Sequence, residues 1–230
     1  MSDFLKLEKK LKTEFNNKNL LKQALIHRSY INEHSSTKME HNERLEFLGD
    51  TVLELVVTEN LYNNYPNPEG ELTNWRAALV NAKMLAYVAH NLEIEKYLFL
   101  SKGEAKDKNE KARNYILANA MEALIGSVYL DKGWDEAKKF IENHILTHLQ
   151  NILENKLYID AKSLFQEQSQ EKVGITPSYQ VISESGPDHN KTFVIGVYLE
   201  DELVAKGSGT SKQEAQMNAA ENGLDAKEWR

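Results

Sequence analysis

The spacing of apolar residues changes near Asn155 of this 230-residue chain, and this change constrains the fold more than any other feature. Before it, residues 4–150 repeat apolar side chains at helical intervals, which predicts an almost wholly helical region. After it, residues 161–170 predict a helix and residues 211–224 predict a last helix. Between them, short β-branched and aromatic runs predict strands at residues 178–183, 192–199 and 203–209. We therefore expect a multidomain chain whose all-α domain is followed by a small α+β (α-β-β-β-α) domain. The expected boundaries are residues 1–153 for the first domain, 154–158 for a linker and 159–228 for the second domain.

Helix-breaking and helix-capping residues divide the helical region further. An acidic stretch that begins at His41 continues to Tyr65 as one long helix, which two prolines end. Residues 72–92 predict another continuous helix, with Thr73 or Asn74 as its cap. Residues 101–113 lack an apolar period, so we expect an exposed, mobile loop there. Two further helices are expected at residues 115–130 and 134–153.

Composition excludes several classes of protein. Cysteine is absent, so disulfides and thiolate metal sites are excluded and any metal must be held by oxygen or imidazole. The first residues are charged and no later run reaches membrane length, so we expect no signal peptide, no transmembrane helix and a cytoplasmic location. The net charge of −7 argues against indiscriminate nucleic-acid binding, although it leaves room for a local basic groove.

The acidic stretch places three carboxylates close together. If residues 41–50 are helical, Glu43, Glu46 and Asp50 stand at i, i+3 and i+7 and share one stripe. Like charges held on one face call for a cation, basic partners or bulk solvent. A metal site and an ordinary amphipathic helix with a wet acidic face both satisfy this pattern.

The helix expected at 115–130 carries a more informative acid. Glu122 lies three residues after Asn119 among apolar neighbours, where an unpaired carboxylate is costly. Together with Glu46 and Asp50 it would form an oxygen-only group suited to Mg²⁺, for which Mn²⁺ is a plausible substitute. The alternative is an ion pair between Glu122 and a basic residue of the same region, either Arg44 or Arg76.

These residues resemble a known family. Residues 42–50, Asn-Glu-Arg-Leu-Glu-Phe-Leu-Gly-Asp, resemble the signature of bacterial ribonuclease III, an endonuclease that cuts double-stranded RNA. Residues 24–30, 75–80 and 121–131 resemble further blocks of the family in the expected order. In the second domain, residues 160–167, 186–189 and 207–215 resemble a double-stranded-RNA-binding domain. The resemblance covers nearly the whole chain.

The resemblance implies a homodimeric enzyme in which each subunit cuts one RNA strand, leaving 5′-phosphate and 3′-hydroxyl ends with short 3′ overhangs. It implies metal ligands at Glu46, Asp50, Asn119 and Glu122, of which Asp50 and Glu122 are also catalytic. Glu43 and Glu69 match acids around the same site with less direct catalytic roles. Phe47 matches an aromatic that contacts the partner subunit, although its spacing fits a simple core residue equally well.

The family commonly has Asp where this chain has Asn119. An amide oxygen still coordinates a hard cation but brings one negative charge fewer, so we expect weaker metal affinity with activity retained. In the second domain the resemblance implies RNA contacts, and Gln213 and Gln216 stand where charged residues are commoner, which favours weaker binding. The implied RNA-binding residues are Gln166, Glu167, His189, Ser211 and Lys212.

Two other functions remain open from the sequence. A non-catalytic double-stranded-RNA-binding protein with a weakened metal site is favoured by Asn119 and disfavoured by the remaining acids. A metal-dependent hydrolase of small phosphate esters leaves the second domain unexplained. Processing of ribosomal and other structured RNA precursors is the role that the family resemblance favours.

Overall fold

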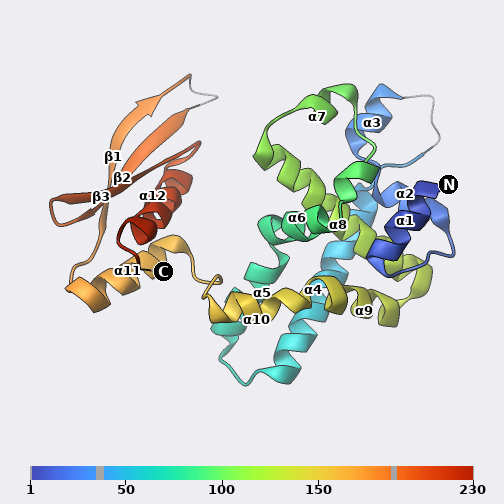
Figure 1. Cartoon of the computed structure of the whole chain (residues 1–230), viewed down its shortest axis with the longest axis horizontal. Helices are drawn as coiled ribbons and strands as arrows, with labels where there is room; N and C mark the ends of the chain where they lie inside the picture. The colour runs from blue at the N-terminus through green and yellow to red at the C-terminus, as the bar shows by residue number, and fades with distance from the viewer. Residues whose placement is uncertain (1, 35–38, 188–190, 230) are drawn as a thin grey trace. The chain divides into compact units, whose positions relative to one another are not determined.

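The structure, a computed structural model of the chain, describes residues 2–34, 39–187 and 191–229. Contacts divide it into two compact units, Met1–Tyr158 and Ile159–Arg230. The first unit is helical and the second combines helices with a three-stranded sheet, so the predicted fold class is confirmed (Figure 1). Along the described ranges, no helix is long and apolar enough to cross a membrane.

Helices of varied length build the first unit, and α4 and α8 are the longest of those described. Asn42 fixes the start of α4, because its buried side chain donates a hydrogen bond to the Ala24 carbonyl at 3.2 Å. The helix ends at Asn64, just before Pro66, as predicted. The elements are α1 Ser2–Leu11, α2 Lys18–Ala24, α3 Arg28–Glu33, α4 Glu43–Asn64, α5 Glu69–Val80, α6 Ala82–Asn91, η1 Ile94–Tyr97, α7 Lys102–Lys106, α8 Glu110–Lys132, α9 Trp134–His144, η2 Leu146–His148 and α10 Leu149–Glu154.

Four expectations about these helices are wrong. The helix expected over residues 72–92 starts earlier, directly after Pro68, and breaks at Asn81, whose extended backbone (ψ 158°) ends α5 and whose side chain caps α6 by accepting from the Met84 amide. Neither Thr73 nor Asn74 is a cap, because both lie inside α5. The loop expected at 101–113 contains the short helix α7, and the helix expected at 134–153 divides into α9, η2 and α10.

Helix α8 forms the centre of the first unit. Most of its residues between Leu117 and Val128 are buried, and it packs against α2, α4, α6 and α9. The crossing of α4 and α8 is very close, and two glycines make it so. A Cβ atom on Gly49 would lie 1.8 Å from the Glu122 carbonyl oxygen, and one on Gly126 would lie 2.2 Å from the Leu45 carbonyl oxygen. Backbone therefore meets backbone at this crossing, which no larger residue allows.

The second unit has the predicted α-β-β-β-α order. Helix α11 (Ala161–Val173) precedes the antiparallel strands β1 (Ser178–Ser185), β2 (Thr192–Leu199) and β3 (Glu202–Gly209), and helix α12 (Lys212–Ala226) follows. Both helices supply residues to one core with β2, built around Phe165, Val197 and Leu224. Strand β1 is an edge of the sheet and has a bulge between Val181 and Ser183.

The segment between the two units begins packed on the first one. Tyr158 contacts Trp75 edge to face, with ring centroids 5.9 Å apart, and the Leu157 amide donates to the Ile152 carbonyl at 3.0 Å. The linker expected at residues 154–158 stays a prediction, and these contacts place Leu157 and Tyr158 in the first unit.

Candidate metal and RNA-binding sites

The crossing of α4 and α8 brings acids from the two helices together. Glu46 and Asp50 come from α4, one turn apart, and Asn119 and Glu122 come from α8. Gly49 lies directly against the backbone of Glu122. Asp50, the residue after Gly49, is therefore close to Glu122. We call these four residues, Glu46, Asp50, Asn119 and Glu122, the acidic group.

The pKa of Glu122 is shifted strongly by this arrangement. Burial, followed by the negative charges of Asp50 and Glu46, raises its pKa to about 8. Among the residues that the structure describes, no basic side chain offsets these effects, and Arg76 donates instead to Thr58 Oγ1 at 3.0 Å. The alternative of a structural ion pair between Glu122 and an arginine therefore finds no support. In the absence of a cation, Glu122 holds a proton at neutral pH.

Glu46 is held by a side chain from the opposite helix. Burial raises its pKa, as do the charges of Glu43 and Asp50, whereas a hydrogen bond from the Asn119 side chain lowers it. When the Asn119 amide nitrogen donates this bond, its amide oxygen stays available as an acceptor. The residue that departs from the family pattern thus links the two helices within the acidic group.

Glu43 has an arginine and a histidine as neighbours, which set it apart from the acidic group. Arg28 Nη1 lies 3.4 Å from its Oε1, and His41 Nδ1 lies 3.8 Å from its Oε2. Arg28 starts α3, so the pair connects the first turns of two helices. Sequence spacing had placed Glu43 on the stripe with Glu46, and its charge does act on Glu46, but Arg28 is its nearest partner.

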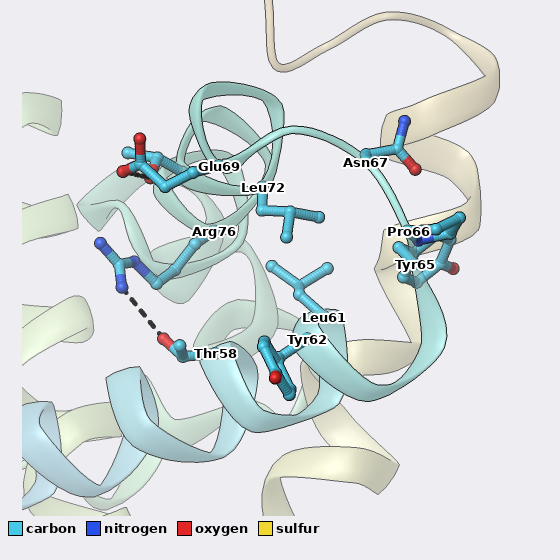
Figure 2. Close-up of a pocket in the computed structure, with 10 residues that line it drawn as sticks. Thr58, Leu61, Tyr62, Tyr65, Pro66, Asn67, Glu69, Leu72 and Arg76 are labelled. Atoms are coloured by element: carbon cyan, nitrogen blue, oxygen red, sulfur yellow. Dashed lines mark hydrogen bonds between the residues drawn. The ribbon is translucent and has the colours of Figure 1, made fainter.

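Glu69 lies on another part of the first unit. It is the first residue of α5 and lines a hollow of about 530 Å³ between the end of α4 and the start of α5 (Figure 2). Its Oε1 accepts a hydrogen bond from Thr73 at 3.2 Å. No contact in the described ranges joins Glu69 to the acidic group, so within one chain the structure does not bring it beside the predicted metal ligands. The hollow is lined by Thr58, Leu61, Tyr62, Tyr65, Pro66, Asn67, Glu69, Leu72, Thr73 and Arg76.

Phe47 is not a core residue. It lies on α4 between Glu46 and Leu48, and 79% of its surface is exposed. Leu55 and Tyr62 on the same helix are also exposed, at 55% and 77%. Large apolar side chains left in water along one helix are typical of a surface that contacts another molecule. The alternative of a core phenylalanine is therefore wrong.

The donor chemistry of the acidic group suits a hard cation. Three carboxylates and one amide supply only oxygen ligands, and the mutual repulsion that raises the pKa of Glu122 is the kind that a divalent ion relieves. However, within residues 2–34, 39–187 and 191–229 no three His, Asp or Glu side chains already form an arrangement that could hold a metal. The assignment of ligands therefore stays a prediction.

The second unit places most of the predicted RNA-binding residues on its surface. Gln166 and Glu167 are exposed on α11. Ser211 is the N-cap of α12, where its Oγ accepts from the Glu214 amide at 3.1 Å, and the exposed Lys212 begins the helix. The prediction for His189 lies outside the described residues.

Two features of these sites were not predicted from the sequence. Arg28 belongs to a segment that resembles a family block, but no charge pattern links it to Glu43 across fourteen intervening positions. Gly49 and Gly126 stand inside helical patterns, where a glycine is compatible with a close approach but does not specify its partner. Their pairing depends on the crossing of two helices, which is a tertiary property.

Comparisons with known proteins identify the class. Residues 17–149 match the Ribonuclease-III-like family and residues 161–226 match the double-stranded RNA binding motif. The chain is 46% identical over 219 residues to Ribonuclease 3 from Natranaerobius thermophilus, covering 95% of this chain and 94% of that protein. It is 42% identical over 226 residues to Ribonuclease 3 from Dehalococcoides mccartyi strain 195, covering 97% and 94%.

A solved structure agrees with these sequences. The nuclease domain of ribonuclease III from Campylobacter jejuni is 41% identical, with a TM-score of 0.54, and the match covers 62% of this chain and 95% of that one. A helical unit with an acidic group, followed by a double-stranded RNA binding motif, defines a class of RNA-directed proteins. The chain belongs to the ribonuclease III family.

Proposed function

We propose that this protein is an endoribonuclease that hydrolyses both strands of double-stranded RNA in the presence of Mg²⁺, with Mn²⁺ as a substitute. The products would carry 5′-phosphate and 3′-hydroxyl ends with short 3′ overhangs, and the substrates would include ribosomal and other structured RNA precursors. The observation that carries the proposal is the acidic group, in which charges on α4 act on Glu122 of α8 within a chain of the ribonuclease III family.

Each residue of the acidic group has a proposed role. Glu46, Asp50 and Glu122 would hold the ion with carboxylate oxygens and Asn119 with its amide oxygen. When bound, such an ion supplies Lewis-acid stabilisation of the charge that develops at phosphorus. Glu122 gives up its proton when the site is loaded, because a ligating carboxylate must be ionised. Asn119 keeps Glu46 oriented toward the group through its hydrogen bond.

Glu43 and Glu69 would support the same reaction less directly. Glu43 holds the Arg28 guanidinium at the first turn of α4, where a fixed cation can attract an RNA phosphate to the side of an otherwise acidic surface. Glu69, which lies apart from the acidic group of its own chain, would act where two subunits and the RNA meet. Both roles fit the weaker effects that we expect on their substitution.

A homodimer is part of the proposal. The exposed Phe47 supplies a large apolar side chain, and the hollow between α4 and α5 offers aromatic and aliphatic lining that could receive it in the partner (Figure 2). The Campylobacter jejuni relative is described as having structural flexibility in a region involved in dimer formation. Two acidic groups in one dimer would allow one cut on each strand.

The second unit would bind the RNA duplex by its shape. A-form RNA presents 2′-hydroxyls and phosphates across a shallow minor groove, which polar residues such as Gln166 and Glu167 can contact without reading a sequence. His189, which lies outside the described residues, would meet the next minor groove. Ser211 and Lys212 would meet phosphates at the start of α12, where helix amides also point outward.

Incubation with a long RNA duplex and Mg²⁺ tests the function. The wild-type chain should produce short duplexes with staggered ends, whereas single-stranded RNA should stay intact and Asp50→Asn should abolish cleavage. Binding without cleavage would instead support a non-catalytic RNA-binding protein, which Asn119 favours. If the protein neither binds nor cleaves RNA but hydrolyses a small phosphate ester, the result would support a metal-dependent hydrolase of small phosphate esters.

A further inference from the structure

The N-terminus of α12 has a single cationic side chain. Lys212 is the first residue of this helix, and the remaining residues to Ala226 include no other lysine or arginine. Under the proposed function, this end of the helix receives RNA phosphates. The state of one ammonium group should therefore have a large influence on how the second unit binds RNA.

In the structure this ammonium group already has an anionic partner. Lys212 Nζ lies 3.3 Å from Glu184 Oε1 on β1, and it also lies 5.7 Å from the centroid of the Phe193 ring on β2. Glu184 and Phe193 are direct partners in the β1–β2 ladder, so their side chains project from the same face of the sheet. Lys212 thus lies over the Glu184–Phe193 pair of the sheet, with the Glu184 carboxylate as its counterion.

The carboxylate of Glu184 has the chemistry of the group that Lys212 would bind in RNA. A carboxylate oxygen and a phosphate oxygen both carry negative charge and accept hydrogen bonds from an ammonium group. A phosphate that approaches Lys212 must either displace Glu184 or remain close to its negative charge. Both outcomes reduce the favourable free energy of binding.

The exposure of the pair indicates which effect is larger. The side chains of Lys212 and Glu184 are 58% and 40% exposed, and solvent-exposed ion pairs contribute little to the stability of a fold. Glu184 therefore gives Lys212 little rigidity that would help it meet a phosphate. Its carboxylate, by contrast, occupies the position beside Lys212 Nζ that a phosphate would take.

We propose that Glu184 limits the affinity of the second unit for double-stranded RNA by competing with phosphate for Lys212. This inference rests on the proposed function and goes beyond it, because it assigns to β1 a residue that weakens RNA binding. An enzyme that must release its products gains from such a residue, since cleaved duplexes present the same phosphates as the substrate.

The test measures RNA affinity of the full chain without cleavage. Fluorescence anisotropy with a labelled RNA duplex longer than the footprint of about 16 base pairs, in EDTA, would compare the wild type with Glu184→Gln at several salt concentrations. We expect Glu184→Gln to bind about three- to fivefold more tightly, as loss of a competing exposed ion pair allows. The salt dependence should steepen by about one released counterion.

A second ion pair, near the C-terminal end of α12, supplies the matched control. Lys227 lies just beyond the C-terminal end of α12, and its Nζ is 2.8 Å from Glu202 Oε1. Glu202→Gln changes the net charge by the same amount as Glu184→Gln but leaves Lys212 paired. It should alter RNA affinity much less, and an equal gain would show that only net charge matters and would overturn the inference.

A double substitution separates competition from other effects. In a Lys212→Gln background, Glu184→Gln should bring little further gain, because the competing partner is already gone. Weaker or unchanged RNA binding by Glu184→Gln, in a variant that melts at the wild-type temperature, would overturn the inference and leave the proposed function standing. A wild-type chain that binds no duplex at any salt concentration would overturn both.

Discussion

Substituting alanine for Gly49 should damage both the stability of the first unit and its activity. The new methyl group would lie 1.8 Å from the Glu122 carbonyl oxygen and 2.8 Å from the Gly126 amide nitrogen. Both neighbours are backbone atoms inside α8, so neither can rotate away as a side chain would. The only relief is a shift of α4 relative to α8.

The size of this shift sets the expected effect. Non-bonded heavy atoms lie about 3.5 Å apart, so the helices must separate locally by about 1.7 Å. Overpacking of this kind costs about 3 kcal/mol, and the better helix propensity of alanine returns about 1 kcal/mol. The net loss of about 2 kcal/mol should lower the melting temperature by about 4–8 °C. Because the acidic group spans the crossing, cleavage of duplex RNA should fall about 100-fold.

Circular dichroism melts and a Mg²⁺-dependent cleavage assay on one RNA duplex measure the two effects. Gly103→Ala is the control, because a methyl group there meets nothing nearer than Ser101 Oγ at 3.9 Å and Gly103 also lies in a helix. This control should leave the melting temperature unchanged or slightly raised. Wild-type stability and cleavage in Gly49→Ala would refute the close crossing as the device that positions the acidic group.

Other predictions concern the metal, the dimer and pH. Asn119→Asp should lower the Mg²⁺ concentration for half-maximal cleavage about fivefold by adding a negative charge, and an unchanged Mg²⁺ response would count against a ligand role. Phe47→Ala should weaken the dimer at least about tenfold by sedimentation equilibrium, while Leu5→Ala, also exposed, should not. Burial lowers the pKa of His144, whose ring donates to the Leu11 carbonyl at 3.0 Å, so protonation favours unfolding. The free energy of unfolding should therefore be unaffected by His144 above pH 6.5 and decrease as the pH falls below it. Urea titrations should show a shallower decrease with pH in His144→Gln. Identical pH slopes in the two proteins would show that His144 does not cause the decrease.

The local signals of the sequence explain which helices could be predicted. The order of elements in the second unit follows from β-branched runs and turn residues, and β2 has the predicted bounds, Thr192–Leu199. The break at Asn81 was missed because one asparagine among helix-forming residues specifies a cap only once the chain around it has turned. By contrast, α7 did have a local signal: Ser101 and Glu104 have capping-box spacing, and Ser101 Oγ accepts from the Glu104 amide at 3.2 Å.

The candidate site was predictable only in part, for a similar reason. Helical spacing places Glu46 and Asp50 on one face of α4, and the apolar surroundings of Glu122 mark it as unusual. Neither pattern specifies that α4 and α8 cross through two glycines, or that Arg28 partners Glu43. These pairings depend on the relative placement of helices far apart in the sequence, which no periodicity within one helix contains.

The bulge between Val181 and Ser183 has a consequence for crowding on RNA. A long duplex can bind several copies of the second unit next to one another, and each copy has β1 as an unpaired edge. Flat edges brought into register by a shared scaffold tend to pair and to grow into aggregates. The bulge makes the backbone of this edge strand irregular, and Glu184 adds a negative charge to the same strand. Copies of this protein bound side by side on one duplex should therefore stay separate and able to dissociate.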